Sequence, residues 1–284
     1  MRLGHNMYSM NILKNYKSTL VDNSKALCNI STGIKLNSAK DNPNKIAQSD
    51  NLKLQILARN AAQSNIQDTS SMIQTFDGAL QEINNNVSRL TELTVRAASE
   101  TNNDGDREII QKEINQILKG IDDLANNTSF NGICLSRDNA PGVTSDPESP
   151  IEYKESTIGD LSNEKVGIPF YDVTTNGVGL NGLDVTTKDN ASKSIEKVKE
   201  ATNIVSRIRS KYGAIQSRLD ETYSSMDDIN ENLSKAQSKI ADSDIAEEML
   251  NYARTNILYQ SSISLMAQSN KFPQDALNIL ANIR

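Results

Sequence analysis

The chain has 284 residues, a formal net charge of −6 and only 4% aromatic residues, with no tryptophan. Globular domains rely on large aromatic side chains to bury area, so this composition is more typical of helix bundles and coiled coils. The acidic balance gives no general attraction for nucleic acid or for an anionic membrane surface. No run of about 18 apolar residues occurs, so the sequence predicts no membrane-inserted helix.

The first expected element is an amphipathic helix near the N-terminus. Leu13, Leu20, Leu27 and Ile34 are spaced by seven residues, which places them on one helix face. An isolated helix is only marginally stable in water, so this row is expected to pair with the other end of the chain or with other subunits. The segment 1–18 lacks a continuous apolar stretch and a small-residue cleavage site, so no ordinary cleaved signal peptide is predicted.

Two longer helices are expected next. The first carries two interleaved heptad rows, which require a partner helix: Ile66, Ile73, Leu80, Val87 and Phe76, Ile83, Leu90, Ala97. Asn103 and Asp104 offer an N-cap for the second helix, with Asp106 in its first turn. Asn131-Gly132 is expected to end it.

Helix-breaking residues gather in the middle of the chain. Four of the six prolines and seven of the thirteen glycines fall between Gly132 and Gly182, where helical structure should stop. The segments 168–173 and 182–187 have strand-like composition and are joined by a turn-rich connector. A small hairpin or two is therefore expected, with residues 136–150 as an exposed loop.

The second half predicts a long helix over about residues 192–241, about 75 Å in length at 1.5 Å per residue. Its heptad row runs without a break: Val198, Val205, Tyr212, Leu219, Met226, Leu233 and Ile240. A further apolar face follows near the C-terminus: Ile245, Met249, Tyr252, Ile257, Ile263 and Met266. We expect this last helix to need a partner, as the first one does.

The sequence predicts no catalytic, cofactor-binding or metal-binding residues. The single histidine, His5, excludes a His-based triad or a multi-His metal site. Adjacent acidic residues such as Asp122-Asp123 and Glu247-Glu248 point about 100° apart on a helix, as on a solvated face. Cys28 and Cys134 have no metal-ligand spacing and are interpreted as buried free thiols, with one disulfide left open.

The motifs at both ends resemble those of bacterial flagellins. The N-terminal half contains ISTGIKLNSAKDN (30–42), RNAAQSNIQDTSSMIQTFDGALQEI (59–83), SRLTELTVRAASET (88–101) and SFNG (129–132). The C-terminal half contains YGAIQSRLDETYSSMDDINENLSKAQSKIADSDIAEEM and the ending MAQSNKFPQDALNIL. These motifs are long and stand in the same order as in the family. Pro43 departs from the family pattern and should hold Asn42 in an extended conformation.

The resemblance implies a mainly α fold, with long antiparallel coiled-coil helices that form a rod and a small β-hairpin region in the middle. It implies seven parts: an inner N-terminal helix (1–33), a spoke (34–46), the first part of the rod (47–135), a short variable outer region (136–190), the second part of the rod (191–243), a second spoke (244–249) and an inner C-terminal helix (250–284). The outer region is far shorter than in many flagellins, so the chain resembles a minimal form.

The resemblance also implies a function. The chain is expected to be a secreted structural subunit that polymerises into the flagellar filament for motility, after export in an unfolded state through the flagellar type III apparatus. Its implied partners are copies of itself, the export chaperone, the filament cap and the hook–filament junction proteins. The terminal helices are the expected assembly elements, through Leu13, Leu20, Leu27, Ile34, Ile257, Ile263 and Met266.

Two further sets of residues are carried over from the family. A toll-like receptor that recognises many flagellins would meet residues that match Arg89, Leu93 and Glu113, a surface that also makes subunit contacts. O-glycosylation is expected at hydroxyl side chains of the outer segment, the candidates being Thr144, Ser145, Ser149, Ser156, Thr157, Thr174 and Thr175.

Three other functions compete with a flagellar filament subunit. A hook–filament junction protein shares similar helical ends, although the full GALQEI and AQSKIADSDIAEEM segments favour flagellin. A secreted enzyme on a flagellin scaffold is rejected because 136–190 is short and contains no HExxH motif. For an adhesin or immune ligand, no motif identifies a target.

Overall fold

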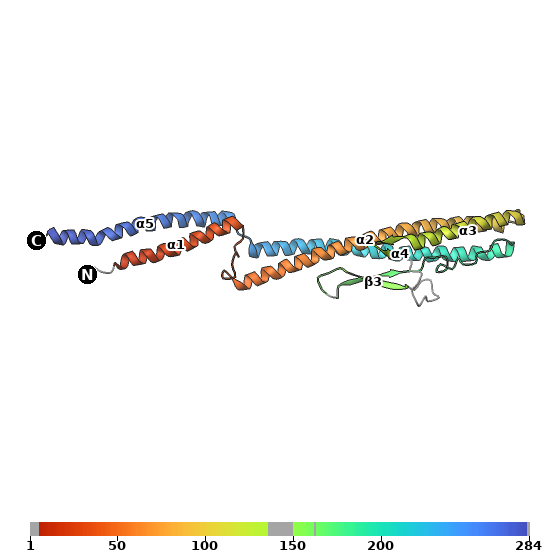
Figure 1. Cartoon of the computed structure of the whole chain (residues 1–284), viewed down its shortest axis with the longest axis horizontal. Helices are drawn as coiled ribbons and strands as arrows, with labels where there is room; N and C mark the ends of the chain where they lie inside the picture. The colour runs from red at the N-terminus through yellow and green to blue at the C-terminus, as the bar shows by residue number, and fades with distance from the viewer. Residues whose placement is uncertain (1–5, 136–149, 162, 283–284) are drawn as a thin grey trace. The chain divides into compact units, whose positions relative to one another are not determined.

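The computed structural model describes residues 6–135, 150–161 and 163–282. In chain order its elements are α1 (Met7–Thr32), α2 (Pro43–Ala98), α3 (Asp104–Asn127), β1 (Ser129–Phe130), β2 (Ile133–Cys134), β3 (Glu152–Thr157), β4 (Lys165–Phe170), α4 (Lys188–Ala241) and α5 (Ile245–Asn282). Long helices and two small hairpins confirm the expected fold class (Figure 1). The chain divides into two compact units, Gln55–Asn230 and Met1–Leu54 with Glu231–Arg284, which are described in turn.

The heptad rows form the core of the Gln55–Asn230 unit. Both rows of α2 are buried over their full length, and so are Val198, Val205, Tyr212 and Leu219 of α4. In this unit α2, α3 and α4 run alongside one another (Figure 1). Because α2 packs against two neighbouring helices, it buries a wider stripe than the single seam of a two-stranded coiled coil.

α3 begins where the sequence predicted and ends earlier. The Asn103 side chain accepts a hydrogen bond from the backbone N–H of Asp106, whose carboxylate accepts from the Asn103 N–H, a complete capping box. The expected end at Asn131-Gly132 is wrong, because the helix stops at Asn127. Asn131 and Gly132 both have positive φ, 49° and 77°, and form the two-residue turn of the β1–β2 hairpin, a geometry that matches strand twist.

The second hairpin pairs β3 with β4 in antiparallel register, Glu152 opposite Phe170. Val166 and Ile168 of β4 are buried, and the Ser156 hydroxyl lies 2.8 Å from that of Thr69 on α2. The expectation that 182–187 would be a strand is wrong. The strand partner lies upstream in the chain, where Glu152–Thr157 alternates half-buried and exposed side chains.

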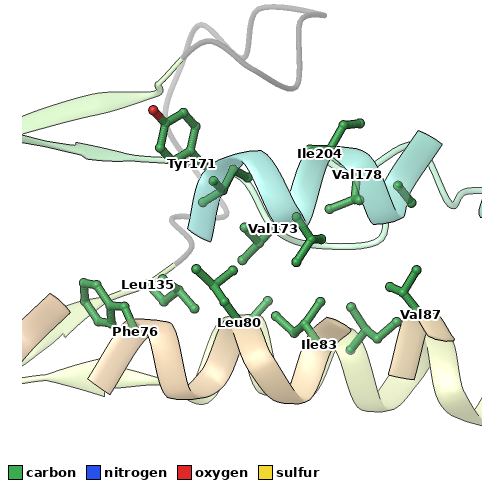
Figure 2. Packing of buried hydrophobic residues seen from close by; sticks show 14 of the residues in the cluster. Phe76, Leu80, Ile83, Val87, Leu135, Tyr171, Val173, Val178 and Ile204 are labelled. Carbon is green, nitrogen blue, oxygen red and sulfur yellow. The ribbon is translucent and has the colours of Figure 1, made fainter. Parts of the chain in front are cut away.

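Residues 171–187 instead form an irregular ribbon that completes the core. Figure 2 shows Tyr171, Val173 and Val178 facing the apolar side chains of the helices. Side chains of α3 accept hydrogen bonds from backbone N–H groups of the ribbon. Asp122 accepts from the Thr175 N–H at 2.8 Å, and Gln111 accepts from the Val185 N–H at 2.8 Å. The buried backbone is therefore hydrogen-bonded without a sheet.

In the other unit, α1 and α5 lie side by side (Figure 1). Gly33 ends α1 with φ 72°, the left-handed conformation typical of a helix C-cap. Ile34, expected in the helical row, lies beyond the helix and forms a β-bridge with Asp242. α2 begins at Pro43, the favoured first position for proline, and α5 begins at Ile245, so the expected spoke 244–249 is mostly helical.

Within the described ranges, no helix is both long and apolar enough to cross a membrane.

Candidate assembly surface

The contact between α1 and α5, here called the seam, mixes polar side chains with aliphatic ones and tyrosines. Its members are buried or half-buried, and apart from Asn256 the residues between them are exposed. They recur at alternating three- and four-residue steps, as in a coiled coil: Ser9, Ile12, Tyr16, Thr19, Asn23 and Ala26 on α1, and Glu248, Tyr252, Thr255, Tyr259, Ser262, Met266 and Ser269 on α5.

Side-chain amides connect the two helices along the seam. The Asn6 Nδ2 donates to the Ser269 backbone oxygen at 2.9 Å. Midway along α1, the Asn23 Nδ2 donates to the Thr255 Oγ1 at 3.0 Å. As the residue number rises along α1 the partner's number falls along α5, which defines one antiparallel register.

The seam is closed by Asn29 at the end nearest the connection to α2. This side chain is 5% exposed; its Nδ2 donates to the Glu248 Oε1 at 2.9 Å, and its Oδ1 accepts from the Asn37 Nδ2 at 2.9 Å. The adjacent bridge adds backbone bonds from the Ser243 N–H to the Gly33 oxygen and from the Lys35 N–H to the Ala241 oxygen. Asn29 thus links α1, α5 and the connecting segment.

Two stacked tyrosines interrupt the run of amides. The rings of Tyr16 and Tyr259 lie 5.3 Å apart at an angle of 26°, a favourable offset-stacked geometry. The neighbouring phenol of Tyr259 raises the pKa of Tyr16.

The heptad row predicted for α1 faces away from α5. Leu13, Leu20 and Leu27, here called the leucine row, are 39%, 43% and 52% exposed. On α5, Ile257 and Ile263 are also exposed, as are the large apolar side chains of Met249, Leu250, Leu258 and Leu265. Of the seven expected assembly residues, Met266 alone contributes to the seam, where it is half-buried.

Sequence reasoning missed Asn23, Asn29 and Glu248 because their polarity gives no hydrophobic signal. The pairs of adjacent acidic residues predict a solvated face for Glu248 and for Asp122, whereas Glu248 bonds Asn29 and Asp122 anchors the ribbon. The signal available was the spacing of Asn23 and Thr19, which fall with Ile12, Tyr16 and Ala26 on a second face of α1 at alternating three- and four-residue steps.

The carried-over receptor contact is only partly available on the surface. The Arg89 Nη2 lies 2.9 Å from the Glu113 Oε1, and both side chains are about half exposed. Leu93 is 2% exposed, so it lies beneath the surface that Arg89 and Glu113 share, and its part in a receptor contact stays a prediction. It faces inward because α2 buries a wide stripe, in which Leu90, Leu93 and Thr94 all take part.

The glycosylation candidates differ in how exposed their side chains are. Thr174 and Thr175 are each 7% exposed and bonded to Asp172 and Asp122, so their burial disfavours glycosylation, which stays a prediction for the described candidates. Ser156 is half-buried against Thr69, and Thr157 is exposed. Thr144, Ser145 and Ser149 lie outside the described residues, as does His5.

Both cysteines are free and exposed, so the expectation of buried thiols is wrong. Cys28 follows Leu27 of the leucine row and is turned away from the seam with it. In the described part of the chain, no group of three or more His, Cys, Asp or Glu side chains could hold a metal ion.

A helical pair held by a seam of mixed polarity, with most of its large aliphatic side chains turned outward, defines a class: structural subunits that associate through their helices. Comparison with known proteins gives the family. The sequence model of the bacterial flagellin N-terminal helical region matches residues 3–139, and that of the bacterial flagellin C-terminal helical region matches residues 195–280. The chain belongs to the bacterial flagellin family and is a structural subunit of the flagellar filament.

Individual flagellins match this chain over almost its full length. A flagellin of Halalkalibacterium halodurans is 33% identical over 282 residues, which cover 99% of this chain and 100% of that protein. A flagellin of Bacillus subtilis is 33% identical over 306 residues, with the same coverage of both chains. A solved flagellar hook-associated protein of Vibrio parahaemolyticus has a TM-score of 0.58 over 71% of this chain and 100% of its own, at 13% identity. That identity shows the fold alone, so the junction-protein alternative is not favoured.

Proposed function

We propose that the chain joins its neighbours in the filament through the leucine row of α1 and the outward apolar side chains of α5. The observation that carries the proposal is that about half of the residues in the contact between these helices are polar, while the leucine row and most of the large aliphatic side chains of α5 are exposed. Contiguous exposed apolar surface on a protein marks an interaction site.

The energetics support contacts between subunits. Burying one leucine contributes about 1.5–3 kcal/mol, whereas a hydrogen bond within the seam contributes a net ~1 kcal/mol. Ordering two long helices costs conformational entropy. The hydrogen bonds of the seam offset only a small part of that entropy cost. The helix pair therefore gains most of its stability when other subunits cover its outward faces.

The low stability of the α1–α5 pair in a free subunit is also compatible with export. A chain whose ends need partners in order to fold can pass unfolded through the flagellar type III apparatus and order on assembly outside the cell. The export chaperone, the filament cap and the hook–filament junction proteins are the proposed further partners. A toll-like receptor that bound the rod would meet the exposed Arg89–Glu113 pair, with Leu93 beneath it.

The test replaces Leu20 and Leu27 together by asparagine and follows polymerisation by electron microscopy and sedimentation. The two changes remove apolar contacts worth several kcal/mol in the filament, so the concentration needed for assembly should rise at least about tenfold. Filaments that form at the wild-type concentration would contradict the proposal.

Leu161→Asn is the matched control, because Leu161 is also an exposed leucine but lies in the Gln55–Asn230 unit. This variant should polymerise as the wild type does. Thermal unfolding followed by circular dichroism should show the same main transition in all three proteins, since neither change touches the buried core.

A further inference from the structure

The face that α1 turns toward α5 is not its most apolar face. The seam of α1 includes Ser9, Thr19 and Asn23, while the leucine row lies one residue further along, about 100° around the helix. Apolar burial alone would rotate α1 until the leucine row met α5. The observed rotation leaves that row exposed.

The amide bonds account for the observed rotation. If the leucine row turned inward, Asn23 would lose Thr255, and Asn29 would lose Glu248. A side-chain amide at a coiled-coil seam position specifies one arrangement at a cost in stability, because alternative arrangements leave it unpaired. Bonds of this kind recur from Asn6 to Asn29, so they act along the whole pair.

We propose that Asn6, Asn23 and Asn29 are positioning residues that select the face of α1 turned toward α5, and thereby keep the leucine row free for a second copy of this chain. The β-bridge between Ile34 and Asp242 fixes one end of the pair and leaves the rotation of α1 to the amides. The use of the leucine row rests on the proposed function, whereas the choice of face stands on the seam geometry alone.

The choice of face can be measured by disulfide formation in the full chain with Cys28 and Cys134 replaced by serine. Ile12→Cys with Met266→Cys reports the observed face, because both are seam residues opposite each other in the antiparallel register. Leu13→Cys with Met266→Cys reports the rotated one. Both pairs leave Asn6, Asn23 and Asn29 and their partners intact. Under assembly conditions the first pair should form a disulfide within one chain readily, and the second at least about tenfold more slowly. Disulfides between chains migrate as dimers and are counted separately.

Removal of the amides should weaken the preference of α1 for the face that it turns toward α5. In the Leu13→Cys/Met266→Cys protein, Asn23→Ala with Asn29→Ala should raise the rate of disulfide formation within one chain several-fold. The matched control is Asn11→Ala with Asn15→Ala, which alters two exposed asparagines of the same helix and should leave the rate unchanged.

Two results would overturn the proposal: equal rates for the two cysteine pairs with the native amides, or no effect of Asn23→Ala with Asn29→Ala. Filament formation is scored separately by electron microscopy. A chain that shows the predicted disulfide pattern and never polymerises refutes the proposed function alone. Filaments that form with the two pairs reacting equally refute the positioning role alone.

Discussion

At the scale of single residues, Tyr212 joins α4 to the second hairpin. It is almost fully buried, and its hydroxyl donates to the Pro169 backbone oxygen at 2.9 Å. Its ring also meets Tyr171 edge to face, with centroids 6.1 Å apart. Burial raises the pKa of Tyr212 above its ordinary value of 10.0, because the charged phenolate cannot be hydrated there.

Tyr212 should therefore make stability depend on alkaline pH. A group whose pKa is raised in the folded state contributes stability that is fully present below the unfolded pKa and is lost as pH rises above it. The free energy of unfolding should fall above about pH 10, where the tyrosine of the unfolded chain ionises. Urea denaturation at pH 7 and at about pH 11 measures the difference.

Tyr212→Phe should cost about 1 kcal/mol at pH 7, because the Pro169 carbonyl loses its partner. The same variant should lose less stability than the wild type between pH 7 and pH 11. An identical alkaline loss in both proteins would show that Tyr212 is not the responsible group.

Single residues also show where prediction from sequence fails. Leu93 matches a surface contact of the family by motif, yet it is buried, because motif matching does not show how many helices pack on α2. Thr174 and Thr175 are glycosylation candidates by their place in the outer segment of the chain. Their burial depends on Asp122, about fifty positions earlier in the chain, and no local pattern reports such a contact.

At the scale of elements, Arg107 stabilises the junction of α2 and α3. The guanidinium donates from Nε to the Ala97 oxygen at 3.0 Å and from Nη2 to the Ser99 oxygen at 3.1 Å. The Ala97 oxygen lies in the last turn of α2, where backbone oxygens have no partners within the helix, and the Ser99 oxygen directly follows that turn. A side chain from α3 thus caps α2 without a glycine.

Arg107→Met should lower the free energy of unfolding by about 1–3 kcal/mol, because it leaves the buried carbonyls unpaired. Arg96→Met is the matched control, since Arg96 lies exposed near the same helix end, and it should change stability by less than about 0.5 kcal/mol. Chemical denaturation measures both variants. Equal effects would assign the loss to the removal of positive charge near the helix end.

The helices differ in how well the sequence predicts their packing. In α2 and α4 the most apolar heptad row is the buried row, so periodicity alone predicts the core. In α1 the most apolar row is exposed, and the packed face carries amides and hydroxyls. Periodicity therefore predicted that α1 needs a partner, but it did not show which face α5 would take.

At the scale of the whole molecule, the two units differ in what holds them together. The Gln55–Asn230 unit has a continuous apolar core built by α2, α3, α4 and the ribbon. In the other unit, the described part of the α1–α5 seam has Ala26 and Asn29 as the buried side chains of α1. Local opening is easiest where few apolar contacts are buried, so the two units should differ in stability before assembly.

Hydrogen exchange, read by mass spectrometry on free subunits and on filaments, tests this account most directly. We predict that amides of α1 and α5 exchange fast in free subunits and at least about a hundredfold more slowly in filaments, while those of α2 and α4 within Gln55–Asn230 are slow in both states. Slow exchange of α1 and α5 in free subunits, or no slowing on assembly, would contradict the claim that their outward faces become buried between subunits.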